Sequence, residues 1–410
     1  MAMDRCMCAA ALTLSLEVLA AQIPQPPASE TAAPPVATPD PFAATQARNI
    51  SELLGPILKK HDVPALAGAI VTTDSLAAIG AVGVRRVGDE TPVTINDKFH
   101  IGSCTKSMTA TLVATFVEEG SLSWSTTLEQ ALPDLASKMD PAYRSVTLEQ
   151  LLTHRAGVPT DLHFDGLWGR LWNHTGSPTE QRATLAQAVL CRPPEHAPGG
   201  KFLYANAGFA IAGYICEVRA AKPWEDLMRE RLFVPLGMTT AGFGAPGTGD
   251  SLDQPRGHGK GRKPQEPGKG ADNPAAIGPG GTVHCSLADW GRYIALHLRG
   301  EHADQRLGAL TIKRETFLKL HEPVRGQGAD YAFGWGVANR PWAGNPGIVL
   351  THSGSNTMWY CVCWLAPEKG FAVLAATNIA DDKAPKACDD AAGALIQDSL
   401  RHPAPAPGAR

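Results

Sequence analysis

The 410-residue sequence has little excess of charge of either sign, because 37 lysines and arginines stand against 40 acidic residues. A formal net charge of −3 argues against a nucleic acid or an anionic membrane as the partner. Beyond an apolar stretch at residues 6–16, no run of residues reaches the length of a transmembrane helix. The hydrophobic fraction of 44% is ordinary for a globular protein. Nothing in the sequence indicates the oligomeric state.

Patterns typical of metal sites and disulfide frameworks are also missing. Nine cysteines fall to seven if residues 1–21 are removed as a leader, and an odd number cannot form a complete set of intramolecular disulfides. The pair Cys361 and Cys363 does not have the spacing of zinc ligands, and no His-Glu-x-x-His run occurs. The sequence therefore predicts no metal and no cofactor.

Composition suggests where the folded domain begins and ends. Residues 1–21 resemble a signal peptide in which Arg5 precedes an apolar stretch, although an acidic residue interrupts that stretch. We expect an Ala/Pro-rich linker at 22–43, one folded domain at 44–401 and a disordered tail at 402–410. A functional leader would place the protein in the periplasm or outside the cell, and a non-functional one would leave it in the cytoplasm.

Strand-like patterns lie near both ends of this domain, and mostly helical patterns lie between them. The predicted strands are 66–72, 77–84, 331–338, 347–350, 358–366 and 370–377. The predicted helices include 103–119, 145–154, 207–220, 286–299 and 384–400, and residues 242–279 are expected to form a long Gly/Pro-rich loop. Early and late strands in one antiparallel sheet, flanked by helices and interrupted by a mainly helical insert at about residues 110–330, give an α+β fold.

The run Ser103-Cys104-Thr105-Lys106 carries the first chemical signal. Serine is a poor nucleophile without a neighbouring base, and positions i and i+3 of a helix share one face. Ser103 and Lys106 can therefore meet, with Ser103 at the amino end of a helix. Taken alone, the run can equally be an N-cap serine followed by a solvated lysine.

Two later segments carry further polar residues. Pro198-Gly199-Gly200 leads into a short apolar stretch with Tyr204 and Asn206, and a strand-like stretch leads into His352-Ser353-Gly354-Ser355. Each residue has an alternative structural interpretation. Tyr204 can be a core tyrosine, Asn206 a turn residue, and His352 a buried histidine of a strand.

In this order, Ser-x-x-Lys, Tyr-x-Asn and His-x-Gly resemble the serine β-lactamase and penicillin-binding superfamily. The tyrosine motif is similar to that of class C β-lactamases, D-alanyl-D-alanine carboxypeptidases and family VIII esterases. The resemblance spans about residues 45–400, and it includes Leu-Leu-Thr-His at 151–154, Pro-Leu-Gly-Met at 235–238 and the glycine turn at 280–281.

The resemblance implies a serine hydrolase in which Ser103 is acylated. Lys106 and Tyr204 would share the transfer of its proton, and which of them is the base stays open because both are mostly protonated at pH 7 when free. Asn206 would bind a substrate amide or Lys106. The N–H groups of Ser103 and Ser355 would form the oxyanion hole, and Gly354 would let the backbone approach the substrate.

The substrate expected is a small-molecule ester, amide or β-lactam. Many relatives carry a lysine where this chain has His352, which is largely neutral at pH 7, so strong capture of a β-lactam carboxylate is less expected. The alternatives are a D-alanyl peptide hydrolase and a catalytically silent penicillin-binding sensor or scaffold. The α/β-hydrolase route is excluded because no Gly-x-Ser-x-Gly occurs. Water activation in deacylation would fall to Tyr204 or Lys106.

Overall fold

A seven-stranded sheet organises the folded part of the chain. Its strands are β1 (Arg48–Asn49), β2 (Ala65–Thr72), β3 (Leu76–Gly83), β11 (Gly336–Asn339), β12 (Ile348–Ser355), β13 (Tyr360–Ala366) and β14 (Phe371–Thr377). Their order is β1-β3-β2-β14-β13-β12-β11, and every neighbouring pair is antiparallel except β1 with β3. The early strand β2 thus pairs with β14, the last strand of the chain, and the predicted α+β class is confirmed.

The computed structural model describes residues 40–324 and 328–403. The predicted signal peptide at 1–21, residues 22–39 of the predicted linker and residues 404–410 of the predicted tail lie outside this part of the chain. Within it, Phe42 is buried and packs into the core, so the folded unit already includes the last residues of the predicted linker.

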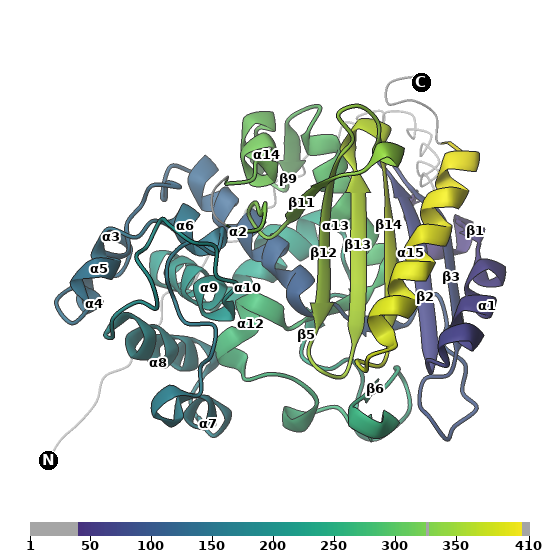
Figure 1. Cartoon of the computed structure of the whole chain (residues 1–410), viewed down its shortest axis with the longest axis horizontal. Coiled ribbons are helices and arrows are strands. Elements are labelled where there is room, and N and C mark those ends of the chain that lie inside the picture. The colour runs from purple at the N-terminus through teal and green to yellow at the C-terminus, as the bar shows by residue number, and fades with distance from the viewer. Residues whose placement is uncertain (1–39, 325–327, 404–410) are drawn as a thin grey trace, which may run out of the picture. The chain divides into compact units, whose positions relative to one another are not determined.

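Both faces of the sheet are covered by helices, which explains why β2 and β14 are buried along their whole length. Side chains of a strand alternate between the two faces. In β2, Leu66 and Ile70 pack against α1 (Ser51–His61) and α15 (Ala384–Arg401), whereas Ala69 and Val71 face the side of α13 (Leu287–Gly300). Figure 1 shows α15 in front of the sheet and α13 behind it.

The segment between β3 and β11 is mostly helical, as expected. It contains α2 (Thr105–Glu118), α3 (Leu128–Ala131), α4 (Pro133–Ala136), α5 (Pro141–Arg144), α6 (Leu148–Leu152), α7 (Leu167–Trp172), α8 (Pro178–Leu190), α9 (Asn206–Ala220), α10 (Trp224–Met228), α11 (Val234–Leu236), α12 (Gly278–Gly281), α13 and α14 (Arg314–His321). Short strands lie among them: β4 (Lys98–His100), β5 (Gly242–Phe243), β6 (Gly257–His258), β7 (Pro264–Gln265), β8 (Val283–Ser286), β9 (Gln305–Leu307) and β10 (Leu310–Ile312).

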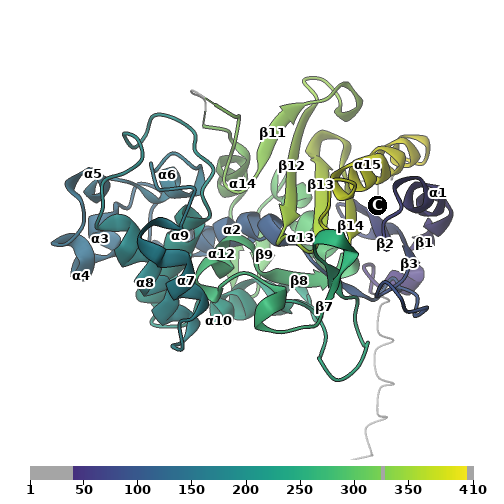
Figure 2. The same cartoon turned by 60° about the horizontal axis from the view of Figure 1, so that its bottom comes forward.

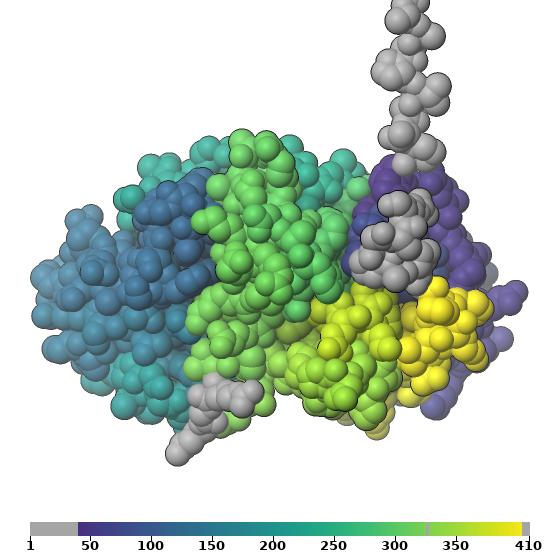
Figure 3. Space-filling view, turned by 90° about the horizontal axis from the view of Figure 1, so that it is seen from above, coloured from purple at the N-terminus to yellow at the C-terminus, as the bar shows by residue number. Residues whose placement is uncertain are grey.

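Helix α2 is the link between the two regions. Its residues from Thr105 to Phe116 are all buried, because α9 and α12 pack on it from the helical region while the sheet lies on its other side. Figure 2 shows α2 running between these helices and the strands. In Figure 3 the segment containing α14, in green, lies between the helical residues in blue and the late strands in yellow-green.

A buried ion network holds three helices of the helical region together. The guanidinium of Arg182 on α8 is fully buried and donates to both carboxylate oxygens of Glu217 on α9, at 3.0 and 2.6 Å. It also donates to Glu225 on α10, at 3.0 and 2.7 Å, and to the carbonyl oxygen of Ala275. A buried arginine needs such complete pairing to be tolerated.

Several predicted elements differ in extent. The predicted strand at 331–338 begins only at Gly336, because Tyr331 forms an isolated bridge to Gly336 and the chain turns between them. The predicted strand at 347–350 continues to Ser355, so the His-x-Gly motif lies within β12 and not after it. The predicted loop at 242–279 contains the short strands β5, β6 and β7, and the edge strand β1 was not foreseen.

Candidate active site

Ser103 lies in a 3-10 turn, Gly102–Cys104, between β4 and α2. Gly102 has φ +47°, and a Cβ there would lie 2.3 Å from the backbone nitrogen of Ser355 on β12. A Cβ on Gly354 would lie 2.0 Å from the carbonyl oxygen of Ile101 and 3.0 Å from the nitrogen of Ser103. Glycine at both positions therefore lets β12 lie directly against the serine turn, with the N–H groups of Ser103 and Ser355 close to the contact.

Lys106 lies one turn further along the helix and is fully buried. Its Nζ lies 3.0 Å from the Oγ of Ser103, 2.7 Å from the Oδ1 of Asn206 and 2.6 Å from the carbonyl oxygen of Gly280. Asn206 is the first residue of α9, and Gly280 belongs to α12. Three separate segments thus converge on one amine, and Asn206 contacts Lys106, one of the two partners that the sequence suggested.

Burial lowers the pKa of Lys106 to about 7, against a small opposing effect of the Cys104 thiol. The neutral amine therefore coexists with the ammonium form near pH 7. Carbonyl oxygens only accept hydrogen bonds, so a neutral amine uses its two N–H groups on Gly280 and Asn206. Its lone pair is then left for the hydroxyl proton of Ser103.

Tyr204 precedes α9, and its hydroxyl interacts with the side chain of Ser103. The Nζ of Lys106 lies 4.8 Å from the centre of its ring. Burial raises the pKa of Tyr204, and the interaction with Ser103 offsets only part of that effect. Tyr204 is therefore a neutral phenol, able to donate a hydrogen bond, whereas Lys106 is the group whose pKa suits a base at neutral pH.

His352 on β12 uses both ring nitrogens inside the protein. Its Nδ1 lies 2.5 Å from the carbonyl oxygen of Ser353, which can only accept, so Nδ1 carries the proton. Its Nε2 then accepts a hydrogen bond from the hydroxyl of Tyr331 at 3.0 Å. Burial, followed by the nearby charge of Lys106, lowers the pKa of His352 to about 4, although the Ser353 carbonyl opposes the shift. His352 is therefore neutral at pH 7.

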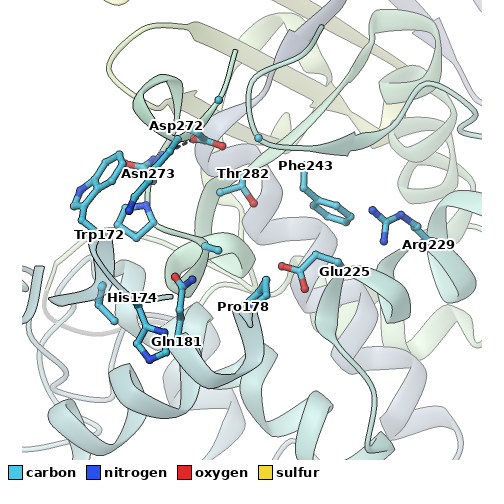
Figure 4. Close-up of a pocket in the computed structure, with 16 residues that line it drawn as sticks. Trp172, His174, Pro178, Gln181, Glu225, Arg229, Phe243, Asp272, Asn273 and Thr282 are labelled. Atoms are coloured by element: carbon cyan, nitrogen blue, oxygen red, sulfur yellow. Dashed lines mark hydrogen bonds between the residues drawn. The ribbon is translucent and has the colours of Figure 1, made fainter. Parts of the chain in front are cut away.

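A second histidine, His100, supports the serine turn through a hydrogen bond to its backbone. The N–H of Gly102 donates to the Nδ1 of His100 at 3.1 Å, so the proton is on Nε2, which lies 3.0 Å from the Oδ2 of Asp272. Asp272 also lines a separate pocket of about 420 Å³, together with Trp172 and Phe243 (Figure 4). This pocket does not include Ser103 in its lining. The sequence offered no signal for the contact between His100 and Asp272, since these two residues lie far apart along the chain.

Cys104 is buried beside the nucleophile, as expected for a small apolar side chain. Its Sγ lies 3.6 Å from the Sγ of Cys361, and burial raises the pKa of the Cys104 thiol. A protonated buried thiol is inert. In the described part of the chain, no group of three or more histidine, cysteine or acidic side chains is suited to a metal ion. Across residues 40–324 and 328–403, no helix combines the length and apolarity needed to span a bilayer.

The chain is similar to several known proteins. Over 78% of its length, the chain is 29% identical to penicillin-binding protein 4 of Amycolatopsis lactamdurans, and the match covers 82% of that protein. It is also 29% identical to a lovastatin esterase of Penicillium rubens. That match covers 48% of this chain and 51% of the esterase.

A crystal structure of a D-alanine carboxypeptidase from Burkholderia cenocepacia superposes with a TM-score of 0.66 at 22% identity. The superposition covers 85% of this chain and 97% of the carboxypeptidase, which shows a shared fold. A family model described as beta-lactamase matches residues 47–397, which is most of the sequence. The chain therefore belongs to the beta-lactamase family.

Proposed function

We propose that this protein is a serine hydrolase that forms an acyl-enzyme on Ser103 and cleaves an ester, an amide or a β-lactam. One observation carries the proposal: the amine of Lys106 lies 3.0 Å from the Oγ of Ser103 while two carbonyl oxygens occupy its other hydrogen-bonding positions. With the pKa of Lys106 lowered to about 7, this arrangement is that of a nucleophile with its base.

In acylation, the neutral amine of Lys106 accepts the hydroxyl proton of Ser103 while Oγ attacks the substrate carbonyl carbon. The N–H groups of Ser103 and Ser355 stabilise the negative charge on the carbonyl oxygen, and each such donor is typically worth about 10²–10³ in rate. The bond to the leaving group then breaks. The proton on Lys106 passes to the leaving atom through the phenol of Tyr204, whose own protonation is unchanged on balance.

Deacylation uses the same groups in reverse. A water molecule takes the position of the leaving group next to Tyr204 and attacks the ester carbonyl on Ser103. Its proton passes to Lys106. When the ester bond breaks, Lys106 returns this proton to Oγ, which restores the serine hydroxyl and the neutral amine and releases the acid. The Lys106 amine and the Tyr204 phenol are the polar groups that contact Ser103 Oγ, which supports this assignment.

The charge of the site favours substrates without a carboxylate. His352 stands where a lysine would hold an anion, and both its nitrogens are hydrogen-bonded within the protein. Lys106 is largely neutral when it acts as a base. An anionic substrate would therefore lose its hydration without gaining an ion pair. Uncharged esters and amides fit better, and the similarity to an esterase supports them.

The test uses Ser103→Ala against p-nitrophenyl butyrate and nitrocefin, with Ser137→Ala at an exposed position as the matched control. We expect Ser103→Ala to lose more than about 10³-fold in kcat, and Ser137→Ala to be unchanged. Intact-mass analysis should show an acyl adduct on the wild-type protein and none on Ser103→Ala. Full hydrolysis by Ser103→Ala would refute the proposal.

The similarity to a penicillin-binding protein favours a second candidate, a D-alanyl peptide hydrolase or a slowly acylating sensor. Both share the acyl-enzyme, so turnover separates them. A sensor would hold a long-lived adduct on Ser103 with negligible hydrolysis, and a peptidase would release D-alanine from a D-alanyl-D-alanine peptide. A periplasmic or secreted location fits either candidate and depends on the predicted leader at 1–21.

A further inference from the structure

His154 lies in the turn after α6 and contacts the backbone on both sides of Tyr204. The N–H of Leu203 donates to the carbonyl oxygen of His154 at 2.8 Å, and the N–H of Ala205 donates to its Nδ1 at 3.1 Å. Leu203 and Ala205 are the two neighbours of Tyr204 in the chain. One residue therefore holds the peptide groups before and after the phenol that contacts Ser103.

The imidazole of His154 also packs on the phenol ring itself. The two ring centres are 4.3 Å apart, with an angle of 39° between the planes. The centre of the imidazole also lies 4.8 Å from the ring centre of Tyr331, 5.6 Å from that of Phe202 and 5.2 Å from that of Phe209. The ring of Tyr204 is thus confined by the same side chain that holds its backbone.

The hydrogen bond from Ala205 decides the protonation of this histidine. An N–H group only donates, so Nδ1 of His154 carries no proton and Nε2 does. That Nε2 is buried and has no hydrogen-bond partner among the described residues. Burial lowers the pKa of His154 well below its usual range, and the charge of Lys106 lowers it further. The imidazole is neutral and leaves one polar atom unsatisfied.

An unsatisfied buried N–H destabilises the folded state, and a phenylalanine at this position would avoid that penalty. His154 also has φ +59°, a conformation that few non-glycine residues adopt and in which asparagine, aspartate and histidine are enriched. The feature that a histidine supplies here and an apolar ring does not is the acceptor at Nδ1. Among residues 40–324 and 328–403, the partner of this acceptor is the peptide group next to Tyr204.

We propose that His154 is a positioning residue for Tyr204. The acceptor at Nδ1 of His154 holds the backbone next to Tyr204 and so directs the phenol toward Ser103. The inference rests on the proposed function, because it assigns His154 to the proton transfer through Tyr204. His154 does not reach the reacting atoms in this assignment. Its effect should therefore appear only in steps in which Tyr204 delivers a proton to the leaving group.

The experiment compares His154→Phe, which keeps an aromatic ring but removes the acceptor, with His154→Asn, whose Oδ1 lies near the position of Nδ1. Asparagine also tolerates the positive φ. With ethyl butyrate, whose leaving group needs a proton, we expect His154→Phe to lower kcat about tenfold at unchanged KM, since a misplaced catalytic group costs rate more than binding. His154→Asn should recover most of the loss. If His154→Phe does not fold, His154→Gln tests the same point, because its amide lies near Nε2.

Two further readouts separate positioning from general destabilisation. The loss in His154→Phe should be larger for ethyl butyrate than for p-nitrophenyl butyrate, because a poorer leaving group depends more on protonation. In a Tyr204→Phe background, His154→Phe should cause less than about a twofold further loss, since residues that act as a unit are not additive. The double variant is slow, so its rate is measured as single-turnover acylation of Ser103, with the acyl adduct monitored by intact-mass analysis over hours.

An equal loss in both backgrounds, an equal loss for both esters, or wild-type kcat in His154→Phe would each overturn the inference. In those cases an inactive Ser103→Ala variant would leave the proposed function intact. If Ser103→Ala were active, the proposed function would fail first, so the two failures are distinguishable.

Discussion

The hydroxyl of Tyr331 donates a 3.0 Å hydrogen bond to the Nε2 of His352 on the strand next to the nucleophile. Together with the bond from Nδ1 to the carbonyl of Ser353, this pairing keeps the imidazole neutral and occupied. A lysine at position 352 would carry a permanent positive charge. His352 is instead neutral, and both of its ring nitrogens are already hydrogen-bonded within the protein. This contact supports the proposal that the substrates bring no anion to this strand.

We expect the enzyme to prefer an uncharged acyl chain. Between p-nitrophenyl butyrate and the mono-p-nitrophenyl ester of succinate, the neutral ester should have the higher kcat/KM, by at least about tenfold, because the carboxylate is desolvated without a partner. His352→Lys should shift this ratio toward the succinate ester. Equal rates for both esters in the wild-type protein would contradict the assignment of His352.

The activity should rise with pH through the pKa of Lys106. Because the base must be deprotonated and its pKa is lowered to about 7, kcat/KM should fall about tenfold for each unit below pH 7 and level off above it. Burial lowers the pKa of both His352 and His154 to values further below 7, so neither accounts for this limb. The profile is measured with p-nitrophenyl butyrate, and a decline in activity from pH 6 to 8 would exclude Lys106 as the base.

Asn206→Asp should move the same limb to higher pH. The new carboxylate would lie where Oδ1 now accepts from Lys106 at 2.7 Å, and a neighbouring negative charge raises the pKa of an amine. We expect an upward shift of at least about one unit, with activity at pH 7 reduced about tenfold and recovered near pH 9. Asn173→Asp, at an exposed position, is the control with the same change of charge. An unshifted pH profile in Asn206→Asp would show that residue 206 does not influence the pKa of the base.

Gly354→Ala should disturb both stability and activity. The new Cβ would lie 2.0 Å from the carbonyl oxygen of Ile101, so the strand must move away from the serine turn. We expect a loss of about 3 kcal/mol in the free energy of unfolding and a fall in kcat of at least about 10²-fold. Gly393→Ala on α15 is the control, since a Cβ there would have no described atom within 4 Å apart from the adjacent residues and the helix's own backbone, and alanine favours a helix. Equal urea midpoints for the two variants would contradict the contact.

Arg182→Met should destabilise the helical region. It leaves the buried carboxylates of Glu217 and Glu225 without their shared partner, which typically costs about 3–5 kcal/mol. Arg219→Met removes an exposed arginine from the same helix as Glu217 and should change the stability by less than about 0.5 kcal/mol. Urea unfolding of both variants measures the difference, and similar stabilities would show that the ion network contributes little.

Local spacing and periodicity were enough for part of this picture. The i, i+3 spacing alone brings Ser103 and Lys106 together, and alternating or continuous apolar runs mark most strands of the sheet. The ends of the helices and strands were harder to predict from the sequence. The strand β12 continues through polar residues up to Ser355 because its pairing with β13 continues there, and no local apolar pattern marks such a pairing.

The amino-acid sequence by itself determined the fold class, the order of the motifs and the pairing of one nucleophile with one amine, since each depends on neighbours along the chain. Only the tertiary structure decided what those groups are chemically. Burial between α2, α9 and α12 lowers the pKa of Lys106 to about 7, Tyr331 donates a hydrogen bond to His352, and the peptide group next to Tyr204 donates one to His154. These effects depend on desolvation and on contacts between residues far apart in sequence, and both exist only once the chain has folded.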